Sequence, residues 1–188
     1  IQNTADDKDI IFQSDNGSGG NETYFYLDGS EGLNRFSKNV LHQDNVKGMY
    51  GTGLDLQIWH GGVDSYITNE VGDLYLIQKA DDKDLILSSD DGSGGHTPYI
   101  TLDGSEAVTQ FDKNLKLPDS VRLVMGTGSD FQIFHDGSHG YIHNTAGTLE
   151  IRNYTTDGDI TLMSDDGSGG ETAYMTIDGS NTRIFVEQ

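Results

Sequence analysis

The strongest constraint on the fold of this chain is an internal repeat, in which residues 6–80 align with residues 81–155 without a gap. The sequence DDKD at residues 6–9 returns at residues 81–84, and the alignment gives 35 identities in 75 positions. Because no insertion interrupts that length, every turn has a fixed size, which is typical of repeats that stack on one another.

The repeat also sets the expected domain organisation. The predicted divisions are residues 1–5, the end of a preceding copy; residues 6–80, the first copy; residues 81–155, the second copy; and residues 156–188, a partial third copy. Ile1 falls in the middle of this pattern, so we expect the sequence to be a piece of a longer protein.

The predicted fold class is all-β. Short segments rich in β-branched and aromatic residues lie between clusters of Asp, Gly, Asn and Ser, as strands do. In the first copy these segments are residues 10–12, 24–27, 56–59, 65–67 and 74–77, and each has an equivalent 75 positions later. No window keeps the apolar period of a helix, although residues 31–45 leave room for a short helical turn. We therefore expect tandem β repeats that form an elongated shaft.

Several predicted strands are apolar on both faces. Leu56 and Ile58 share one face of their strand, and Trp59 points to the other. Residues 10–12, 75–77 and 85–87 behave in the same way, whereas residues 148–152 alternate like a half-solvated strand. Leu, Ile, Val and Phe supply only 44 of the 188 residues, so one chain has little material for a core. We expect a neighbouring copy to cover the second face; the alternative is a two-sheet sandwich within each copy.

The charge and the cysteine count exclude several classes of protein. The net charge of −20 argues against a nucleic-acid partner, because phosphate contacts need an excess of Lys and Arg. No apolar run approaches the ~20 residues that span a bilayer, so we expect no membrane insertion. The absence of cysteine excludes disulfides, thiolate catalysis and cysteine-bound metals.

Three repeated motifs carry a family resemblance. They are GTGxD[L/F]QIxH at 51–60 and 126–135, YIxN at 66–69 and 141–144, and SD[N/D]GSGG at 14–20, 89–95 and 164–170, each copy of the last being followed by [L/I]DGS. Together they resemble the repeats of tail-fibre and related virion structural proteins of marine bacteriophages. The resemblance implies a homotrimeric β-rich shaft in a virion or another extracellular appendage. The partners expected for such a shaft are copies of the same chain. Other fibre or baseplate proteins and a host surface glycan or receptor are left open as further partners, because the resemblance does not specify contact with the host.

The SD[N/D]GSGG loops are the first candidate site. Their acidic and amide side chains are hard oxygen ligands suited to calcium: Asp15, Asn16, Asp90, Asp91, Asp165 and Asp166. A tight turn uses the same residues, because Asp and Gly adopt the backbone angles that turns need. The loop occurs once in each copy of the repeat and lacks the distal Glu of an EF-hand. We therefore favour the turn and predict no bound cofactor.

The histidines are the second candidate. His60 and His135 recur, and the second copy adds His139 and His143. Around a threefold axis, one histidine per chain would bring three imidazoles together as a transition-metal site. Because His139 and His143 have no counterpart in the first copy, we favour strand-end residues with hydrogen-bond partners and assign no metal ligand.

Catalysis and sugar binding are the remaining candidate activities. Glu31 and Glu106 recur, and Glu22, Glu70 and Glu150 have no evident second acid, so no carboxylate pair for glycoside hydrolysis is assigned. We predict that the chain is not an enzyme and has no catalytic residue. The recurring tyrosines are candidates either for stacking on sugars or for packing, and packing is favoured. They are Tyr24, Tyr66, Tyr99, Tyr141 and Tyr174.

The sequence as a whole predicts a structural shaft segment of a viral tail fibre or similar appendage. A receptor- or glycan-binding fibre module and a cellular adhesin filament are the alternatives. A polysaccharide-cleaving tailspike is a third. A binding module predicts one copy that departs from the others with exposed aromatic residues, whereas a shaft predicts equal copies. The two full copies are similar, which favours the shaft.

Overall fold

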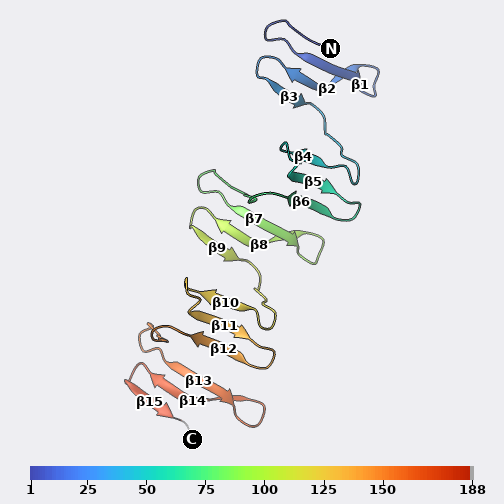
Figure 1. Ribbon diagram of the computed structural model, residues 1–188. Helices are drawn as coiled ribbons and strands as arrows, with labels where there is room; N and C mark the ends of the chain where they lie inside the picture. Colours follow the sequence, from blue (N-terminus) through green and yellow to red (C-terminus); the bar gives the residue numbers. More distant parts are fainter. Residues whose placement is uncertain (187–188) are drawn as a thin grey trace. The chain divides into compact units, whose positions relative to one another are not determined.

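The computed structural model describes residues 1–186, and its regular structure is entirely β, as predicted. Fifteen strands in this part of the chain form five antiparallel sheets, each built from three consecutive strands (Figure 1). No helix among the described residues is long and apolar enough to cross a membrane.

Three of the sheets have a long central strand, and we call them the long sheets. Their strands are β1 (Ile10–Asp15), β2 (Asn21–Asp28) and β3 (Leu33–Phe36); β7 (Leu85–Asp90), β8 (His96–Asp103) and β9 (Val108–Phe111); and β13 (Ile160–Asp165), β14 (Glu171–Asp178) and β15 (Arg183–Val186). In each, the register shifts by a β-bulge in the first hairpin, for example between Phe12 and Gln13.

The other two sheets are the short sheets. Their strands are β4 (Gly48–Tyr50), β5 (Leu56–His60) and β6 (Ser65–Asn69), and β10 (Arg122–Met125), β11 (Phe131–His135) and β12 (Gly140–Asn144). Ile58 pairs with Ile67 in the first, and Ile133 pairs with Ile142 in the second. Long and short sheets alternate along the chain, so one full copy of the repeat contains one of each.

The chain divides into two units, Ile1–Lys79 and Ala80–Gln188. The first holds β1 to β6 and the second holds β7 to β15. Within each unit, every contact between described strands lies inside a sheet, so no sheet is packed face to face on another. The two-sheet sandwich that the sequence left open is therefore not formed within a copy.

No side chain in residues 1–186 is buried. The chain exposes 15,334 Å² of surface, whereas a compact monomer of 20.5 kDa exposes about 8,800 Å². The difference of about 6,500 Å² is large because each sheet leaves both of its faces accessible. The hydrogen bonds of the sheets are thus formed inside one chain, but a hydrophobic core is not.

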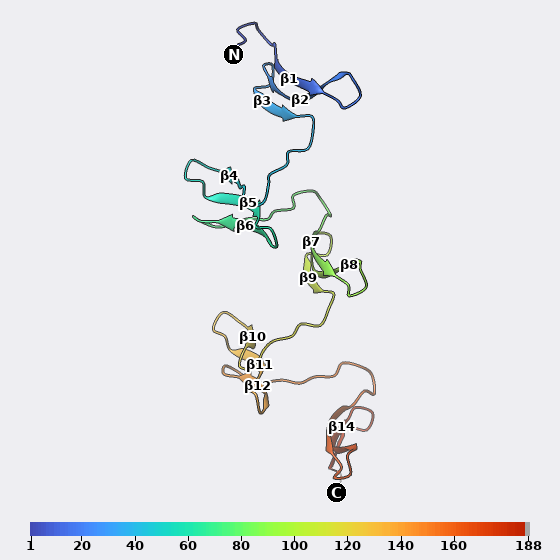
Figure 2. The same ribbon diagram turned by 90° about the vertical axis from the view of Figure 1, so that its right-hand side faces the viewer.

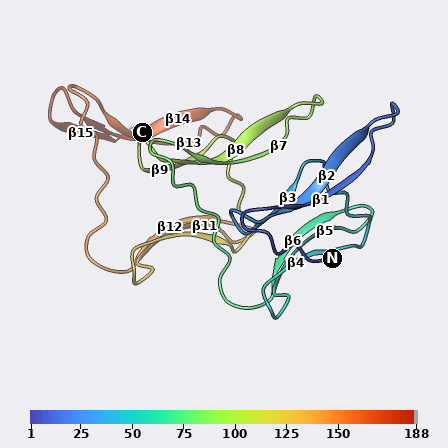
Figure 3. The same cartoon turned by 90° about the horizontal axis from the view of Figure 1, so that it is seen from above.

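The strand predictions are confirmed for four of the five segments of a copy and wrong for the fifth. Residues 74–77 and their equivalents at 149–152, inside the strand expected over 148–152, belong to no strand. Both segments lie in plain coil, after β6 in Figure 2 and after β12 in Figure 3. A strand needs a neighbouring backbone to pair with, and a single chain provides none there. Residues 31–45 contain the strand β3 in place of the helical turn, and β4 was not predicted.

Candidate functional surface: the apolar sheet faces

Each long sheet presents one apolar face. In the first, Phe12, Phe25 and Phe36 stand side by side in register on adjacent strands. The ring centroids of Phe12 and Phe25 are 4.3 Å apart, and those of Phe25 and Phe36 are 6.0 Å apart. The equivalent rows are Leu87, Ile100 and Phe111, and Leu162, Met175 and Val186. Phe36 remains 62% exposed, so the row lies open to solvent in a single chain.

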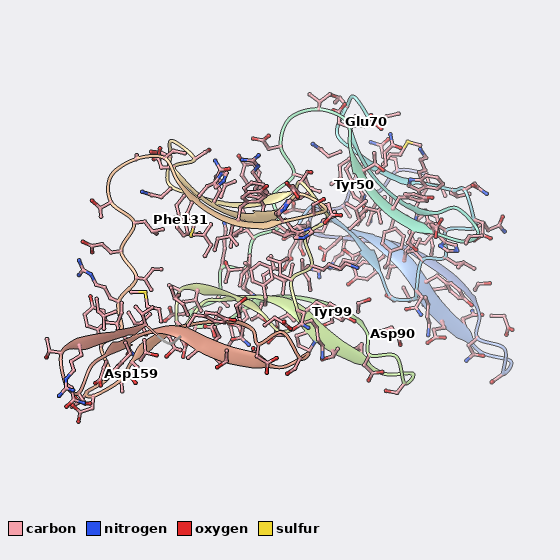
Figure 4. The ribbon with its side chains drawn as sticks, turned by 90° about the horizontal axis from the view of Figure 1, so that it is seen from below. Tyr50, Glu70, Asp90, Tyr99, Phe131 and Asp159 are labelled. Carbon is pink, nitrogen blue, oxygen red and sulfur yellow. The ribbon has the colours of Figure 1, made fainter. Side chains whose placement is uncertain are left out.

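The short sheets present an equivalent face. Ile58 and Ile67 form one row, and Tyr50 and Leu56 form the next. The second short sheet repeats these rows with Leu123, Ile133 and Ile142, and with Met125 and Phe131. Ile67 and Ile142 are each 59% exposed. Figure 4 labels Tyr50 and Phe131, which come from these two faces.

The residues before β4 border a shallow groove on this face. The groove has a volume of about 640 Å³ and is lined by Leu41, Tyr50, Ile58 and Ile67, among others. Its lining is mainly apolar, and Leu41 is 87% exposed. The groove therefore adjoins the apolar row of Ile58 and Ile67, although His60, Ser65 and the two rings of Trp59 and Tyr66 also line it.

On the opposite face of each short sheet, side chains of the same chain pack against the central aromatic ring. Lys47 Nζ lies 4.7 Å from the centre of the Trp59 ring, and the Tyr66 ring stacks on Trp59 at 4.5 Å. Lys47 precedes β4 and Tyr66 lies in β6, on the two sides of β5, so both faces of the Trp59 ring are covered. Trp59 is half-buried as a result. Within one chain the Trp59 ring therefore already has a partner on each face, and its covering by a neighbouring chain stays a prediction.

The second copy repeats this ladder with different residues. Arg122 lies over Phe134 at 4.1 Å, and Tyr141 stacks on Phe134 at 4.8 Å. A cation, an aromatic ring and a tyrosine thus recur at equivalent positions of the two copies. The cation was not predicted from the sequence, although Lys47 and Arg122 align and both are positively charged.

The SD[N/D]GSGG loops form the tight turns between β1 and β2 and between their equivalents. Asp91 Oδ1 accepts hydrogen bonds from the backbone N–H groups of Ser93 at 2.7 Å and Gly95 at 3.1 Å. The bond from the backbone N–H of Ser93 is the main reason that the pKa of Asp91 is lowered. Gly92 has a φ of 80°, which a residue with a side chain rarely adopts. The candidate calcium ligands are therefore used inside the turn.

The other loops repeat this arrangement. Asn16 Oδ1 accepts from the Ser18 N–H at 2.8 Å, and Asp166 Oδ1 accepts from the Ser168 N–H at 2.7 Å. Asp15, Asp90 and Asp165 each accept the N–H of the glycine two positions later. In residues 1–186 no group of three or more His, Asp or Glu side chains is placed to hold a metal ion.

Beside each long sheet, another aspartate joins two loops by a hydrogen bond, and we call this contact the clasp. Asp84 Oδ1 accepts the backbone N–H of Gly104 at 3.0 Å, and Asp9–Gly29 and Asp159–Gly179 repeat this bond. A Cβ atom on Gly104 would lie 2.4 Å from the carbonyl oxygen of Lys83, so only glycine fits. This contact was not predicted, because its two partners are 20 residues apart in the sequence and produce no local turn signal.

Hydrogen bonds within the DGS turns lower the pKa values of Asp28, Asp103 and Asp178. The hydroxyl of Ser30, the Arg35 guanidinium and the Glu31 N–H lower the pKa of Asp28 to about 2. The side chains of Asn181 and Ser180 lower the pKa of Asp178 to about 2. In the middle copy, the backbone N–H of Glu106 is the main cause of the lowered pKa of Asp103.

These shifts predict loss of stability in acid. A folded-state pKa of about 2 lies below the unfolded value of about 3.9. The stabilisation is therefore complete above pH ~4 and disappears as the pH falls through about 2. We expect the melting temperature to fall over that range. The variant Asp28→Asn, Asp103→Asn, Asp178→Asn keeps an acceptor oxygen but has no carboxylate, so its melting temperature should change less. Equal acid sensitivity of the two proteins in calorimetry would contradict this assignment.

The four candidate histidines each contact a different partner. The Nδ1 atom of His60 lies 3.0 Å from the Ser65 hydroxyl, and that of His135 lies 3.1 Å from Asp119 Oδ1. Both occupy the end of a central strand, which confirms the prediction of strand-end residues with hydrogen-bond partners. His143 packs its edge against Phe134 at 5.1 Å, and His139 lies in the hairpin turn beside Asp136.

The glutamates considered as catalytic acids are also dispersed. Glu22 pairs with Lys38, Glu31 with Arg35, and Glu150 with Arg152. The backbone N–H of Glu106 bonds to Asp103, and that of Glu70, labelled in Figure 4, bonds to Asp55. These residues do not form a carboxylate pair across a cleft.

The recurring tyrosines take part in contacts within the chain. The hydroxyl of Tyr99 donates to the carbonyl oxygen of Asp90 at 3.1 Å; Figure 4 labels both residues on one hairpin. Tyr24 and Tyr174 make the same bond at 3.1 and 3.0 Å. With Tyr66 and Tyr141 in the ring ladders, all five contribute to packing or to turn closure.

Comparisons with protein-family models, curated proteins and solved structures found no match to this chain.

Proposed function

We propose that this chain is a structural segment of a homotrimeric fibre shaft, in a viral tail fibre or a similar appendage. The observation that carries the proposal is the combination of repeated apolar sheet faces with the absence of any buried side chain in residues 1–186. Such a chain forms its backbone hydrogen bonds alone but needs other copies to remove its apolar rows from water.

The exposed area supports self-association. The excess of about 6,500 Å² over a compact monomer is several times the ~800 Å² that each partner buries in a typical interface. At roughly 25 cal/mol per Å² of apolar surface, covering even part of it outweighs the entropy cost of association. Each sheet would place its apolar face inward and its ring ladder or polar face outward.

The repeat supports a fibre. Equivalent rows recur in each copy, so each copy offers the same contact to neighbouring chains. Contacts of this kind extend along a line when they do not close into a ring. The number of chains, three, and the location in a virion come from the sequence resemblance. The net charge of −20 would keep the fibre soluble, with self-repulsion reduced by salt.

The function of such a segment would be mechanical. It would give length and stiffness and hold a host-binding region away from the particle. A glycan-binding module has less support, because the rings of Trp59 and Phe134 are covered on both faces within the chain.

The mass and dimensions of the protein in solution test the proposal. We expect sedimentation equilibrium to give three times the 20.5 kDa of one chain. We also expect small-angle scattering to show a rod whose radius of gyration exceeds the ~2.2·N^0.38 Å of a compact particle. A stable folded monomer, or a compact oligomer, would refute the shaft; a rod-shaped dimer would retain the shaft and correct the number of chains.

A further inference from the structure

Two segments with strand-like sequences have no backbone partner in the described part of the chain. Residues 73–77 follow β6 and residues 148–152 follow β12, at equivalent positions of the two copies. The backbone groups of these residues make no hydrogen bond in the described chain. Both segments therefore have the composition of a strand without the ladder of a strand.

Each segment is held where it begins. Gly72 and Gly147, with φ of 73° and 70°, end the turns that precede the segments. The Asn69 amide donates to the carbonyl oxygens of Val71 and Gly72, both at 2.9 Å. In the second copy, Asn144 makes the same two bonds at 3.0 and 3.1 Å. The course of the chain into both segments is thus fixed by the same side-chain contacts.

The segments are suited to β-pairing. Leu74 and Leu76 occupy alternate positions, as Leu149 and Ile151 do, so their side chains would share one face of a strand. All four are between 46% and 66% exposed. Extended apolar segments with unpaired N–H and C=O groups are templates for pairing with another chain.

We propose that residues 73–77 and 148–152 become β-strands by pairing with a second copy of this chain. This inference rests on the self-association proposed above and adds that the chains are joined by backbone hydrogen bonds as well as by side chains. We choose a second copy of the chain as the pairing partner for two reasons. The surface that one chain exposes beyond a compact monomer is large enough for several interfaces. Each copy of the repeat also presents both an unpaired segment and sheets with unpaired edge strands. Leu74, Leu76, Leu149 and Ile151 would then lie inside the assembly.

Amide hydrogen exchange on the assembled full-length chain tests the inference. We expect the amides that face the partner strand, at alternate positions within 74–77 and 149–152, to exchange on the order of 100-fold or more slowly than in an unstructured peptide, as paired strands do. The mass of the same sample is measured in parallel. An assembly with unprotected amides would overturn the inference and leave the shaft standing. A monomer would overturn both.

Proline substitutions provide a second test. Because successive N–H groups of a strand point to opposite sides, Tyr75→Pro and Leu76→Pro are compared singly, and one of them must remove a ladder bond. We expect that variant to associate at least about tenfold more weakly. The matched control is Gln43→Pro, since the second copy has Pro118 at this position. Val46 N–H bonds to the Gln43 carbonyl as Val121 N–H bonds to that of Pro118. Unchanged association of both test variants would refute the pairing.

Discussion

Ile67→Asp is expected to abolish assembly. Ile67 is 59% exposed in the single chain, where a surface substitution changes the stability by no more than about 0.5 kcal/mol. In the proposed shaft the same carboxylate would lie between chains without a counter-charge. An uncompensated buried charge costs roughly 3–5 kcal/mol, and every chain of the assembly would carry one. Sedimentation equilibrium should therefore show a monomer at concentrations where the unmodified chain is assembled.

The adjacent residue gives a matched control. Thr68 follows Ile67 in β6 and points to the opposite face, in the row of Gln57 and Met49. Thr68→Asp adds the same charge to the same strand, so it should leave the mass unchanged. Normal assembly of Ile67→Asp, or equal damage from Thr68→Asp, would show that the apolar face is not the interface.

Gly104→Ala is expected to open the clasp between Asp84 and the β8–β9 turn. The added methyl group would lie 2.4 Å from the Lys83 carbonyl oxygen, which is backbone and has little freedom to move. Overpacking of this kind costs typically about 1–3 kcal/mol. The equivalent changes Gly29→Ala and Gly179→Ala meet the same obstacle, so the triple variant should show the largest fall in melting temperature.

Gly140→Ala is the control for this prediction. Gly140 begins β12, no atom lies within 4 Å of the position that an alanine methyl group would take, and its φ is not positive. Alanine there restricts the unfolded chain, and we expect a gain of about 0.4–1 kcal/mol. The two Gly→Ala changes should thus shift calorimetric melting in opposite directions. If Gly104→Ala lowers the melting temperature no more than Gly140→Ala does, the added methyl group does not collide with the Lys83 carbonyl oxygen, and the prediction is wrong.

The repeat and the short-range chemistry were readable from the sequence. The offset between copies, the all-β class and the segments that became β1, β2, β5 and β6 follow from alternation and turn residues, which act over a few positions. The division of faces at Ile58 and Trp59 was predicted correctly for the same reason, since side chains alternate along any strand. The turn role of the SD[N/D]GSGG loops also depends only on neighbouring residues.

Contacts between residues far apart in the sequence appeared only in the structure. Lys47 covers Trp59 because β4 pairs with β5, and Asp84 binds Gly104 because two distant turns meet at one end of a sheet. Residues 74–77 have strand composition but no strand, because pairing depends on a second backbone and not on composition. Local periodicity thus specifies which residues can form strands and which face is apolar. Which backbone or ring lies beside each of them is set by tertiary pairing, and no local pattern encodes it.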